Sequence, residues 1–447
     1  MSRELYFCQR RYNFSTTNCT FIHNAIVFLS DKIQFEYGEL YLHTQRGGAM
    51  DATMFTHGSP GRLTPIGTGA FKYLAYIPNA LPPHLQLDAD TLLLLSQADQ
   101  SMGRLAGIGH FVKNSALLLK PLVRREAVLS SQIEGTQSDL NDLYRYEADQ
   151  LLFPARKGSA DNEDAHEVLN YVIALEYGVH RLESLPVSTR LIRELHRHLM
   201  KGVRGEQATP GELRTTQNWI GPAGCTLNEA TYVPPPVDAM TDALGGVERY
   251  IHSAPEFPQL IRLALVHYQF EAIHPFVDGN GRVGRLLLAL LAVQWNLLPS
   301  PLLYLSAYFD RNRDTYYHLL LGVSTRGEWL EWIRFFLSAV VSESYDTLSR
   351  LRALQDLRDS WHVLLESQPR TSALTLRLAD SLMEQPFVTV PAVAKLLGVT
   401  YHTAQLHVDR LQQEGILKPR DAQHYGKMYT AGDILKILES PLTHSES

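Results

Sequence analysis

Apolar residues at spacings of three and four dominate the middle of this 447-residue chain, and they constrain its fold more than any other feature. That spacing places the apolar side chains on one face of an α-helix. Helices that each have one apolar face bury those faces by packing against one another. The sequence therefore predicts a mainly α-helical bundle, with the pattern present at 88–111, 115–135, 162–184, 188–200, 258–273 and 281–298.

Composition limits the class of protein. Apolar residues make up 45% of the chain and charged residues 20%, as in soluble globular proteins. A net charge of −6 gives no general attraction to nucleic acid or anionic lipid, so such contacts need a local patch. The longest apolar run, 286–293, is too short to span a bilayer. Cys8, Cys19 and Cys225 are too few for a disulfide framework, and the first residues form no signal peptide. We therefore expect a cytoplasmic protein without a membrane segment.

One segment interrupts the helical pattern. Residues 211–236 are rich in Thr, Gly and Pro and lack helical spacing. Residues 215–220 and 230–233 could pair as a short hairpin across a glycine-rich turn. A hairpin alone in a helical domain leaves open edges. The segment is therefore either a surface loop or a flap that binds an extended chain by strand addition.

The C-terminal residues 372–440 have a pattern of their own. A helix, a turn at Thr400, a second helix and a two-stranded wing resemble a winged helix. Residues 372–447 contain seven Lys or Arg and eight Asp or Glu, which argues against strong non-specific DNA binding. The wing is locally basic, with Lys418, Arg420 and Lys427, and the second helix contains His402 and His407. The sequence is compatible with either DNA contact or protein docking by this C-terminal module.

A glycine-rich turn directly precedes the most apolar helix. Gly279, Asn280 and Gly281 bring free backbone N–H groups to a helix N-terminus, where an anion such as phosphate can approach closely. Arg282 and Arg285 lie three apart on one face of the first turn. Cations are unfavourable at a helix N-terminus, so their presence favours a polyanionic ligand.

Two residues before this helix have the chemistry for nucleotide transfer. Asp278 can supply a hard oxygen to Mg²⁺ that bridges phosphates. His274 has the pKa range of a general base. Together with the phosphate turn, these residues indicate a reaction in which a hydroxyl attacks phosphorus.

A zinc site is the alternative for the same region. His267, Glu271 and His274 fall at i, i+4 and i+7 on one helix face and could gather a metal in a hydrolase. Pro275, however, forces His274 out of the helical region and ends the helix there. The third ligand is therefore aimed differently from the first two.

The stretch HPFVDGNGRVGR at 274–285 resembles the signature of Fic-domain protein adenylyltransferases, HxFx(D/E)GNGRxxR, with every fixed position matched. The resemblance extends from about residue 70 through the motif to the segment 303–337. It implies a Fic-type helix bundle with a β-hairpin flap, to which the small α+β winged-helix domain is added. It also implies transfer of AMP from ATP to a protein hydroxyl. The related phosphotransferase branch has lysine where Arg282 stands.

The resemblance implies roles for the motif residues. His274 would take the proton from a target Ser, Thr or Tyr hydroxyl, and Asp278 would hold Mg²⁺ against the α- and β-phosphates. The amides of 279–281 and the Asn280 side chain would stabilise the α-phosphate. Arg282 would contact the departing pyrophosphate.

Further positions follow from the same resemblance. The segment 211–236 resembles the family's flap, which clamps the target chain as an added strand, with Ile220 and Gly221 near the nucleotide. Tyr316 and Gln269 are expected to border the adenosine. Phe276 belongs to the nucleotide-binding motif, although its side chain is expected to anchor the loop in the core.

The stretch SSQIEG at 130–135 matches the family's inhibitory motif, (S/T)xxxE(G/N). Gly135 is expected to end a helix, which places Glu134 in the last turn, where the helix dipole disfavours a carboxylate. A paired residue would compensate for this unfavourable position of the carboxylate. The resemblance implies that Glu134 pairs with Arg285 and occupies the space that the γ-phosphate needs. Ser130 lies four residues earlier on the same face.

The length predicts several domains, because 447 residues exceed what one core holds. Residues 1–66 show no helical period, and the first fifty residues before Met50 and Met54 are hypothesised to be a mis-called upstream start. The predicted divisions are an N-terminal extension 1–66, a helical region with the inhibitory helix 67–160, a Fic catalytic domain 161–340, a connecting helix 341–371, a winged helix 372–440 and a tail 441–447.

The implied partners are ATP with Mg²⁺ and a target protein, which includes another copy of this chain. The sequence leaves open the target's identity, a homodimer, and removal of AMP by the same site. The alternative function is a DNA-binding transcriptional regulator whose Fic-like domain senses nucleotide. The retained His274 and Asp278 favour an active enzyme.

Overall fold

The structure is a computed structural model that describes residues 50–69, 72–111, 115–152, 163–203, 209–222, 224–369, 371–420 and 427–440. Within these residues the chain is mainly α-helical with two small antiparallel sheets, which confirms the predicted fold class. None of the described helices is both long and apolar enough to cross a bilayer. The hypothesis of a mis-called start concerns residues outside this description, apart from Met50.

All six stretches with helical apolar spacing are helices, and their ends are close to the predicted ones. Asp88 accepts a hydrogen bond from the Thr91 N–H at the start of the first, and Ser188 caps the fourth as expected. Gly135, with φ 94°, follows the second. The six helices are α3 (Ala89–Phe111), α4 (Ser115–Ile133), α6 (Glu163–Arg181), α7 (Thr189–Leu199), α9 (Gln259–Ile273) and α10 (Asn280–Gln294).

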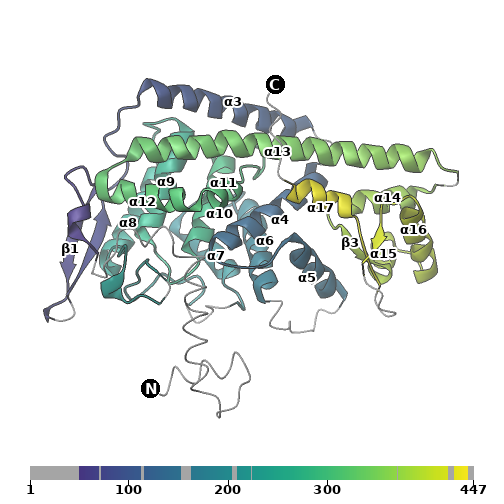
Figure 1. The fold of residues 1–447 in the computed structure, drawn as a ribbon, viewed down its shortest axis with the longest axis horizontal. Helices are drawn as coiled ribbons and strands as arrows, with labels where there is room; N and C mark the ends of the chain where they lie inside the picture. The colour runs from purple at the N-terminus through teal and green to yellow at the C-terminus, as the bar shows by residue number, and fades with distance from the viewer. Residues whose placement is uncertain are drawn as a thin grey trace, which may run out of the picture.

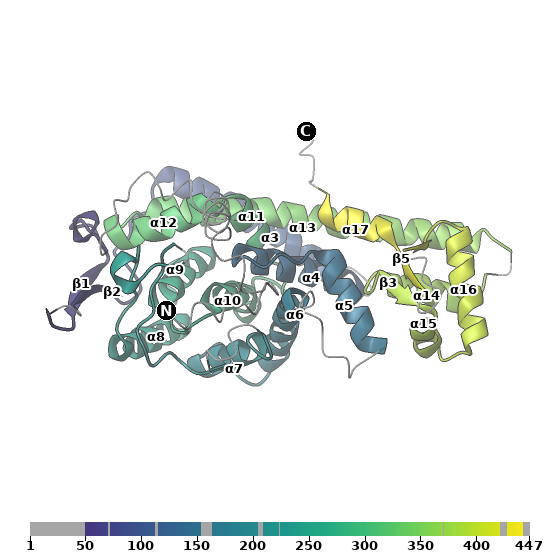
Figure 2. The ribbon, with the colours of Figure 1, turned by 60° about the horizontal axis from the view of Figure 1, so that its bottom comes forward.

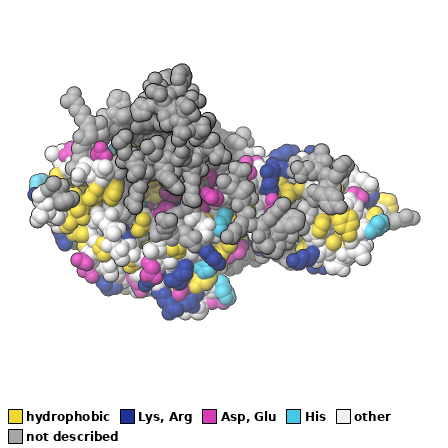
Figure 3. Space-filling model, turned by 90° about the horizontal axis from the view of Figure 1, so that it is seen from below, with side chains coloured by type: hydrophobic (Ala, Val, Ile, Leu, Met, Phe, Trp, Pro, Cys, Tyr) yellow, Lys and Arg dark blue, Asp and Glu magenta, His cyan; other side chains and the backbone are white. Residues whose placement is uncertain are grey.

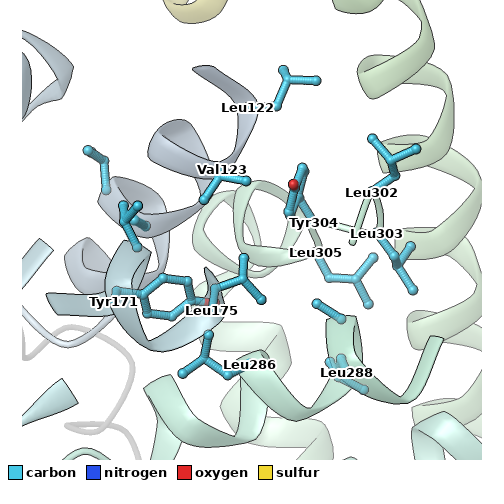
Figure 4. Packing of buried hydrophobic residues seen from close by; sticks show 14 of the residues in the cluster. Leu122, Val123, Tyr171, Leu175, Leu286, Leu288, Leu302, Leu303, Tyr304 and Leu305 are labelled. Atoms are coloured by element: carbon cyan, nitrogen blue, oxygen red, sulfur yellow. The ribbon is translucent and has the colours of Figure 1, made fainter. Parts of the chain in front are cut away.

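Helices α9 and α10 form the centre of the molecule (Figures 1 and 2). Every residue of α9 except Gln259 and Glu271 is buried, because neighbouring helices cover all of its faces. Helix α10 packs against α4, α6, α7 and α9, and Figure 4 shows its Leu286 close to Leu175 and Tyr171 of α6. The loop between α9 and α10 therefore starts and ends on a rigid frame. The surrounding helices are α5 (Leu140–Leu152), α8 (Val237–His252), α11 (Ser306–Arg311) and α12 (Arg313–Arg326).

The longest helix, α13 (Trp329–Glu366), runs along the whole molecule with α3 beside it (Figure 1). It is anchored to the centre by Trp332, whose Nε1 donates a hydrogen bond to the Ala264 carbonyl of α9 at 2.9 Å. A connecting helix was predicted only for 341–371. The structure instead has one continuous helix across the boundary at 340, because its apolar face begins in the catalytic region.

The sequence did not predict the N-terminal hairpin. Strands β1 (Gly61–Ile66) and β2 (Tyr73–Pro78) pair antiparallel, from Gly61 opposite Pro78 to Ile66 opposite Tyr73. The short 3₁₀-helix η2 (Ala52–Met54) precedes them. The hairpin crosses the boundary predicted at 66. The Tyr76 N–H of β2 donates to the Val233 carbonyl at 2.9 Å, so this hairpin lies against the segment 211–236.

The C-terminal module comprises the described residues of 372–440 and lies at one end of α13 (Figure 2). Its strands form a sheet of order β3-β5-β4. The module packs on α4 and α5, where Lys120 pairs with Glu384 at 2.7 Å and the Tyr144 ring stacks on Phe387. Its elements are α14 (Ala373–Leu382), β3 (Phe387–Thr389), α15 (Val390–Leu397), α16 (Tyr401–Gln413), β4 (Lys418–Pro419), β5 (Met428–Thr430) and α17 (Gly432–Glu439).

Candidate active site

The loop between α9 and α10 turns through two left-handed residues. Helix α9 ends at Ile273, as Pro275 predicts, and His274 takes φ 50° and ψ 63°. Gly279 takes φ 77° and ψ 9° as the residue before α10. A side chain at Gly279 would be strained by that conformation and would contact the Met200 sulfur at 3.0 Å. The glycine is therefore required for the chain to enter α10 at this angle.

The Asn280 side chain holds the loop closed. Its Oδ1 accepts from the Phe276 N–H at 2.8 Å, and its Nδ2 donates to the Phe276 carbonyl at 2.9 Å. Phe276 is fully buried, as expected for a loop anchor. The predicted contact of Asn280 with the α-phosphate stays a prediction, because both polar atoms of this side chain are engaged within the loop.

His196 of α7 is a site residue that the sequence did not predict. Its Nδ1 accepts a hydrogen bond from the Gly211 N–H at 2.8 Å, and its Nε2 donates to the Asp278 carbonyl at 3.0 Å. Its ring stacks on Phe276 with centroids 3.8 Å apart. Burial lowers the pKa of His196 to about 4, which keeps the ring neutral and able to accept at Nδ1. The only available signal was a histidine within the apolar face of α7.

The His274 imidazole is arranged as a base. Its Nδ1 donates to the Glu271 carbonyl at 3.3 Å, which leaves the lone pair on Nε2. Burial lowers the pKa of His274 to about 4, so the ring is neutral near pH 7. A neutral imidazole with a free Nε2 can accept a proton from a hydroxyl.

The turn at the start of α10 already holds a carboxylate. Arg285 is buried and donates from Nη2 to Glu134 Oε1 at 2.6 Å, and from Nε to Ser130 Oγ at 2.8 Å. A β-carbon at Gly281 would lie 2.2 Å from Glu134 Oε1, so the carboxylate lies directly over this glycine. Burial alone would raise the pKa of Glu134, but the Arg285 charge holds it below its ordinary value. The predicted pairing of Glu134 with Arg285 is present in the structure, and Ser130, predicted only to share the helix face of Glu134, also contacts Arg285.

Arg282 faces two further carboxylates. Its guanidinium is 3.6 Å from Asp278 Oδ1 and 3.5 Å from Glu167 Oε2, and it is almost fully buried. Nε and Nη1 have no hydrogen-bond partner among the described residues. Glu167 of α6 was not predicted. The two arginines of α10 are therefore balanced by acidic side chains at the helix end where a polyanion was expected.

Asp278 is the residue that fits a magnesium ion. Its side chain is half exposed, and Oδ1 accepts the Gly279 N–H at 2.6 Å. Mg²⁺ in nucleotide sites is commonly held by one or two carboxylates together with phosphate oxygens and waters. No cluster of three His, Cys, Asp or Glu able to hold a metal occurs among the described residues. Asp278 is therefore a single carboxylate that could hold such an ion together with phosphate oxygens and waters.

The structure does not assemble the alternative zinc site. His267 is buried and its Nε2 pairs with the Tyr316 hydroxyl at 2.8 Å, within rings that include Phe309 and Trp332. Burial lowers the pKa of His267 to about 3 and raises that of Glu271 to about 8. His267 therefore belongs to the aromatic core, away from the loop that carries His274.

The residues expected to border the adenosine lie in the core. Tyr316 is 1% exposed, and Gln269 is 3% exposed with its Nε2 donating to the Asn79 carbonyl at 2.8 Å. Both assignments stay predictions. The next residue, Tyr317, is 37% exposed, and the Glu134 and Arg285 charges act on its pKa, which burial raises beyond its ordinary value.

The segment 211–236, which we call the flap, is less regular than predicted. Ile220 and Tyr232 exchange two backbone hydrogen bonds as an isolated antiparallel pair. The described residues around them do not extend this pair into strands. The 3₁₀-helix η6 (Leu227–Glu229) occupies the turn. Ile220 is 37% exposed, and a β-carbon at Gly221 would lie 2.7 Å from the Cys225 sulfur. Arg214 and Asn218 of the same segment contact the motif loop, which no sequence pattern indicated.

Two family models match the chain. Residues 92–180 match the Fic/DOC family N-terminal model and residues 186–292 match the Fic/DOC family model. The curated protein adenylyltransferase Fic of Drosophila virilis is 26% identical over 230 residues, which cover 49% of this chain and 44% of that protein. The same enzyme of Drosophila yakuba is 28% identical over 177 residues, covering 39% and 32%. The chain spans less than half the length of these relatives.

Two solved structures are also similar to parts of this chain. A Fic family protein from Desulfovibrio desulfuricans aligns with a TM-score of 0.47 at 17% identity, covering 78% of this chain and 98% of that one. Fic-1 from C. elegans aligns with a TM-score of 0.44 at 21% identity, covering 59% and 76%.

Proposed function

The chain carries a Fic domain, and from this premise we propose that it is a protein adenylyltransferase that transfers AMP from ATP to a Ser, Thr or Tyr hydroxyl of a target protein. One observation supports this most directly. One contiguous segment, 274–285, contains both parts that the reaction needs. These are a neutral imidazole with a free Nε2 and a helix N-terminus with two buried arginines. Base and phosphate cradle are thus fixed relative to each other by the short loop that Asn280 closes.

The proposed reaction uses the residues of this loop in turn. His274 Nε2 takes the proton of the target hydroxyl, whose oxygen forms a bond to the α-phosphorus of ATP. The bond between the α-phosphorus and the bridging oxygen breaks, and pyrophosphate leaves with its negative charge. Arg282, whose Nε has no hydrogen-bond partner among the described residues, stabilises that charge. Asp278 would hold Mg²⁺, which neutralises phosphate charge when bound.

Glu134 is proposed to be an internal brake on this reaction. Its carboxylate lies over Gly281 and pairs with Arg285, where a nucleotide phosphate would otherwise contact the start of α10. Two anions in that space repel each other at short range and low solvent exposure. ATP would therefore bind in a reactive position only after Glu134 moves away.

Transfer of label from α-³²P-ATP to protein tests both proposals. Glu134→Gly should raise labelling severalfold, because it removes the competing carboxylate. Glu256→Gly is the matched control, since Glu256 is exposed on a loop, and it should leave labelling unchanged. Adding His274→Ala to Glu134→Gly should abolish labelling. Labelling that persists without His274 would refute its role as the base, and no gain from Glu134→Gly would refute the brake.

The flap is proposed to hold the target chain. Its exposed Trp219 and Ile220 lie near the motif loop and leave an edge to which an extended segment can add as a strand. Such pairing recognises mainly backbone, so the target is defined by an accessible hydroxyl in an extended segment. A second copy of this chain satisfies the same requirement. We place the reaction in the cytoplasm, as the sequence predicts.

The C-terminal module is proposed to be a winged helix with a binding role. Helix α15 ends at Gly398, Thr400 caps α16, and a three-stranded sheet completes the unit. Figure 3 shows hydrophobic surface on this lobe, and its exposed apolar side chains include Leu396, Tyr401 and Leu406. Arg420 of the wing donates to Asn141 of α5 at 2.9 Å. A shift assay on genomic fragments at several salt concentrations separates DNA contact from protein docking, because phosphate contacts weaken with salt.

A further inference from the structure

His274 has a backbone conformation that its side chain does not favour. At φ 50° and ψ 63° the residue is left-handed, a region that residues other than glycine, asparagine and aspartate rarely adopt. Such a conformation costs on the order of 1 kcal/mol and persists only where the surroundings fix it. This conformation sets the direction in which the imidazole leaves the chain and turns the His274 carbonyl toward the flap. The groups that donate hydrogen bonds to this carbonyl therefore fix the orientation of the imidazole.

Arg214 of the flap is the first of these groups. It is 1% exposed, its Nε donates to the His274 carbonyl at 3.0 Å, and its backbone N–H donates to the Pro275 carbonyl at 3.0 Å. The other guanidinium nitrogens donate to the carbonyls of Thr216 and Pro235. A buried cation is costly unless every donor has a partner. Arg214 therefore ties the flap to the motif loop at several carbonyls at once.

Asn218 is the second group. Its Nδ2 donates to the His274 carbonyl at 3.2 Å and to the Phe276 carbonyl at 2.8 Å. Its Oδ1 is buried without a hydrogen-bond partner in the described part of the chain. An unsatisfied acceptor costs free energy, so the side chain is held in place by what its amide donates. Both donors to the His274 carbonyl thus come from the flap.

We propose that Arg214 and Asn218 are positioning residues for AMP transfer, which hold the left-handed backbone of His274 and so aim its imidazole at the attacking hydroxyl. The inference rests on the proposed function. It adds that the flap orients the His274 side chain as well as providing the edge that binds the target. Asn218 lies two residues before Ile220, so a strand that pairs with the flap and the hydrogen bonds that orient His274 share one short segment. A change in the flap when the target binds would therefore also change the orientation of the His274 side chain.

Gln259, the first residue of α9, provides a matched control. Its Nε2 also donates to a backbone carbonyl, that of Trp295 at 3.0 Å, and it lies outside both the flap and the motif loop. In the Glu134→Gly background, Asn218→Ala should lower kcat by about 10- to 100-fold, the range expected for a misplaced catalytic group, with little change in KM for ATP. Gln259→Ala should stay within about twofold of the background, because the contact that it loses lies at the other end of α9 from His274. Arg214→Lys keeps the charge but loses the planar fork, and it should fall between them.

A second measurement does not depend on turnover. The His274 imidazole is titrated by NMR in Glu134→Gly and in the same protein with Asn218→Ala. If Asn218 holds the ring in its buried position, its loss exposes the ring, and the pKa of His274 moves up from the value in the parent toward the ordinary 6.5. An unchanged pKa, or a kcat for Asn218→Ala equal to that of Gln259→Ala, would overturn the inference and leave the proposed function intact. Absence of any AMP transfer by Glu134→Gly would instead refute the function, while the titration would still decide the role of Asn218.

Discussion

At the scale of single residues, the site depends on charge states that burial and pairing impose on its side chains. His274 and His196 are kept neutral by burial, and Arg285 remains paired with Glu134, a residue 151 positions away in the chain. A base must be neutral to act, and an acceptor at Nδ1 must be unprotonated to hold Gly211. Burial supplies both conditions without a neighbouring charge.

The depressed pKa of His274 predicts an unusual pH profile. In the Glu134→Gly protein, kcat/KM for ATP should stay level from pH 8 down to about 6, because the folded imidazole is protonated only near its pKa of about 4. Removing Glu134 acts in the same direction, since its negative charge favours the protonated ring. Initial rates in a series of buffers measure this. A loss of activity with a midpoint near 6.5 would show that the ring is solvated in the active enzyme.

At the scale of elements, helix α4 carries the proposed brake. Ser130 and Glu134 lie one turn apart at its C-terminal end, and both contact Arg285 of α10. Ser130 also accepts from Arg285 through its backbone carbonyl at 2.9 Å. The position of the carboxylate over Gly281 therefore depends on how α4 packs against α10.

Ser130→Ala should weaken the brake without removing it. The variant loses the hydrogen bond from Arg285 Nε to Ser130 Oγ but keeps both the carbonyl contact and the Glu134 pair. A hydrogen bond to a charged group contributes about 1.5–3 kcal/mol, and part of that would favour the blocked state. AMP transfer should rise, yet less than for Glu134→Gly in the same assay. Labelling equal to that of the parent would mean that Ser130 does not support the blocked position.

At the scale of the whole molecule, one hydrophobic core extends from Met50 to Leu438 of the C-terminal module. The continuous helix α13 and the contacts of the module with α4 and α5 join the two parts. Residues of α5 such as Tyr144 stack on Phe387 of the module. Parts that share a core in this way are expected to unfold together.

Differential scanning calorimetry should therefore show a single unfolding transition. Phe387→Ala should destabilise the protein by about 3–5 kcal/mol, as for other buried aromatic side chains, and should lower the temperature of the whole transition. Tyr401→Ala, at an exposed position of α16, is the control and should leave it in place. Two separate transitions, with only the smaller one shifted by Phe387→Ala, would show that the module folds independently.

Much of this arrangement could be predicted from local sequence. The spacing of apolar residues locates helices α9 and α10 because it reflects the period of the helix itself. His274, Asp278 and the glycines are contiguous, so their proximity needs no tertiary information. The burial of Tyr316 and Gln269 could not be predicted in this way, because it depends on packing between elements that are distant in the sequence. Their expected place beside the nucleotide stays a prediction.

The sequence by itself determined the helices and the turn that joins His274 and Asp278 to α10, because each depends on residues that are neighbours along the chain. Only the tertiary structure decided that Glu167, His196, Arg214 and Asn218 meet at the motif loop. Helical period states which residues share a face, but it does not state which faces meet. That choice follows from the packing of whole helices around α9 and α10, to which every element contributes.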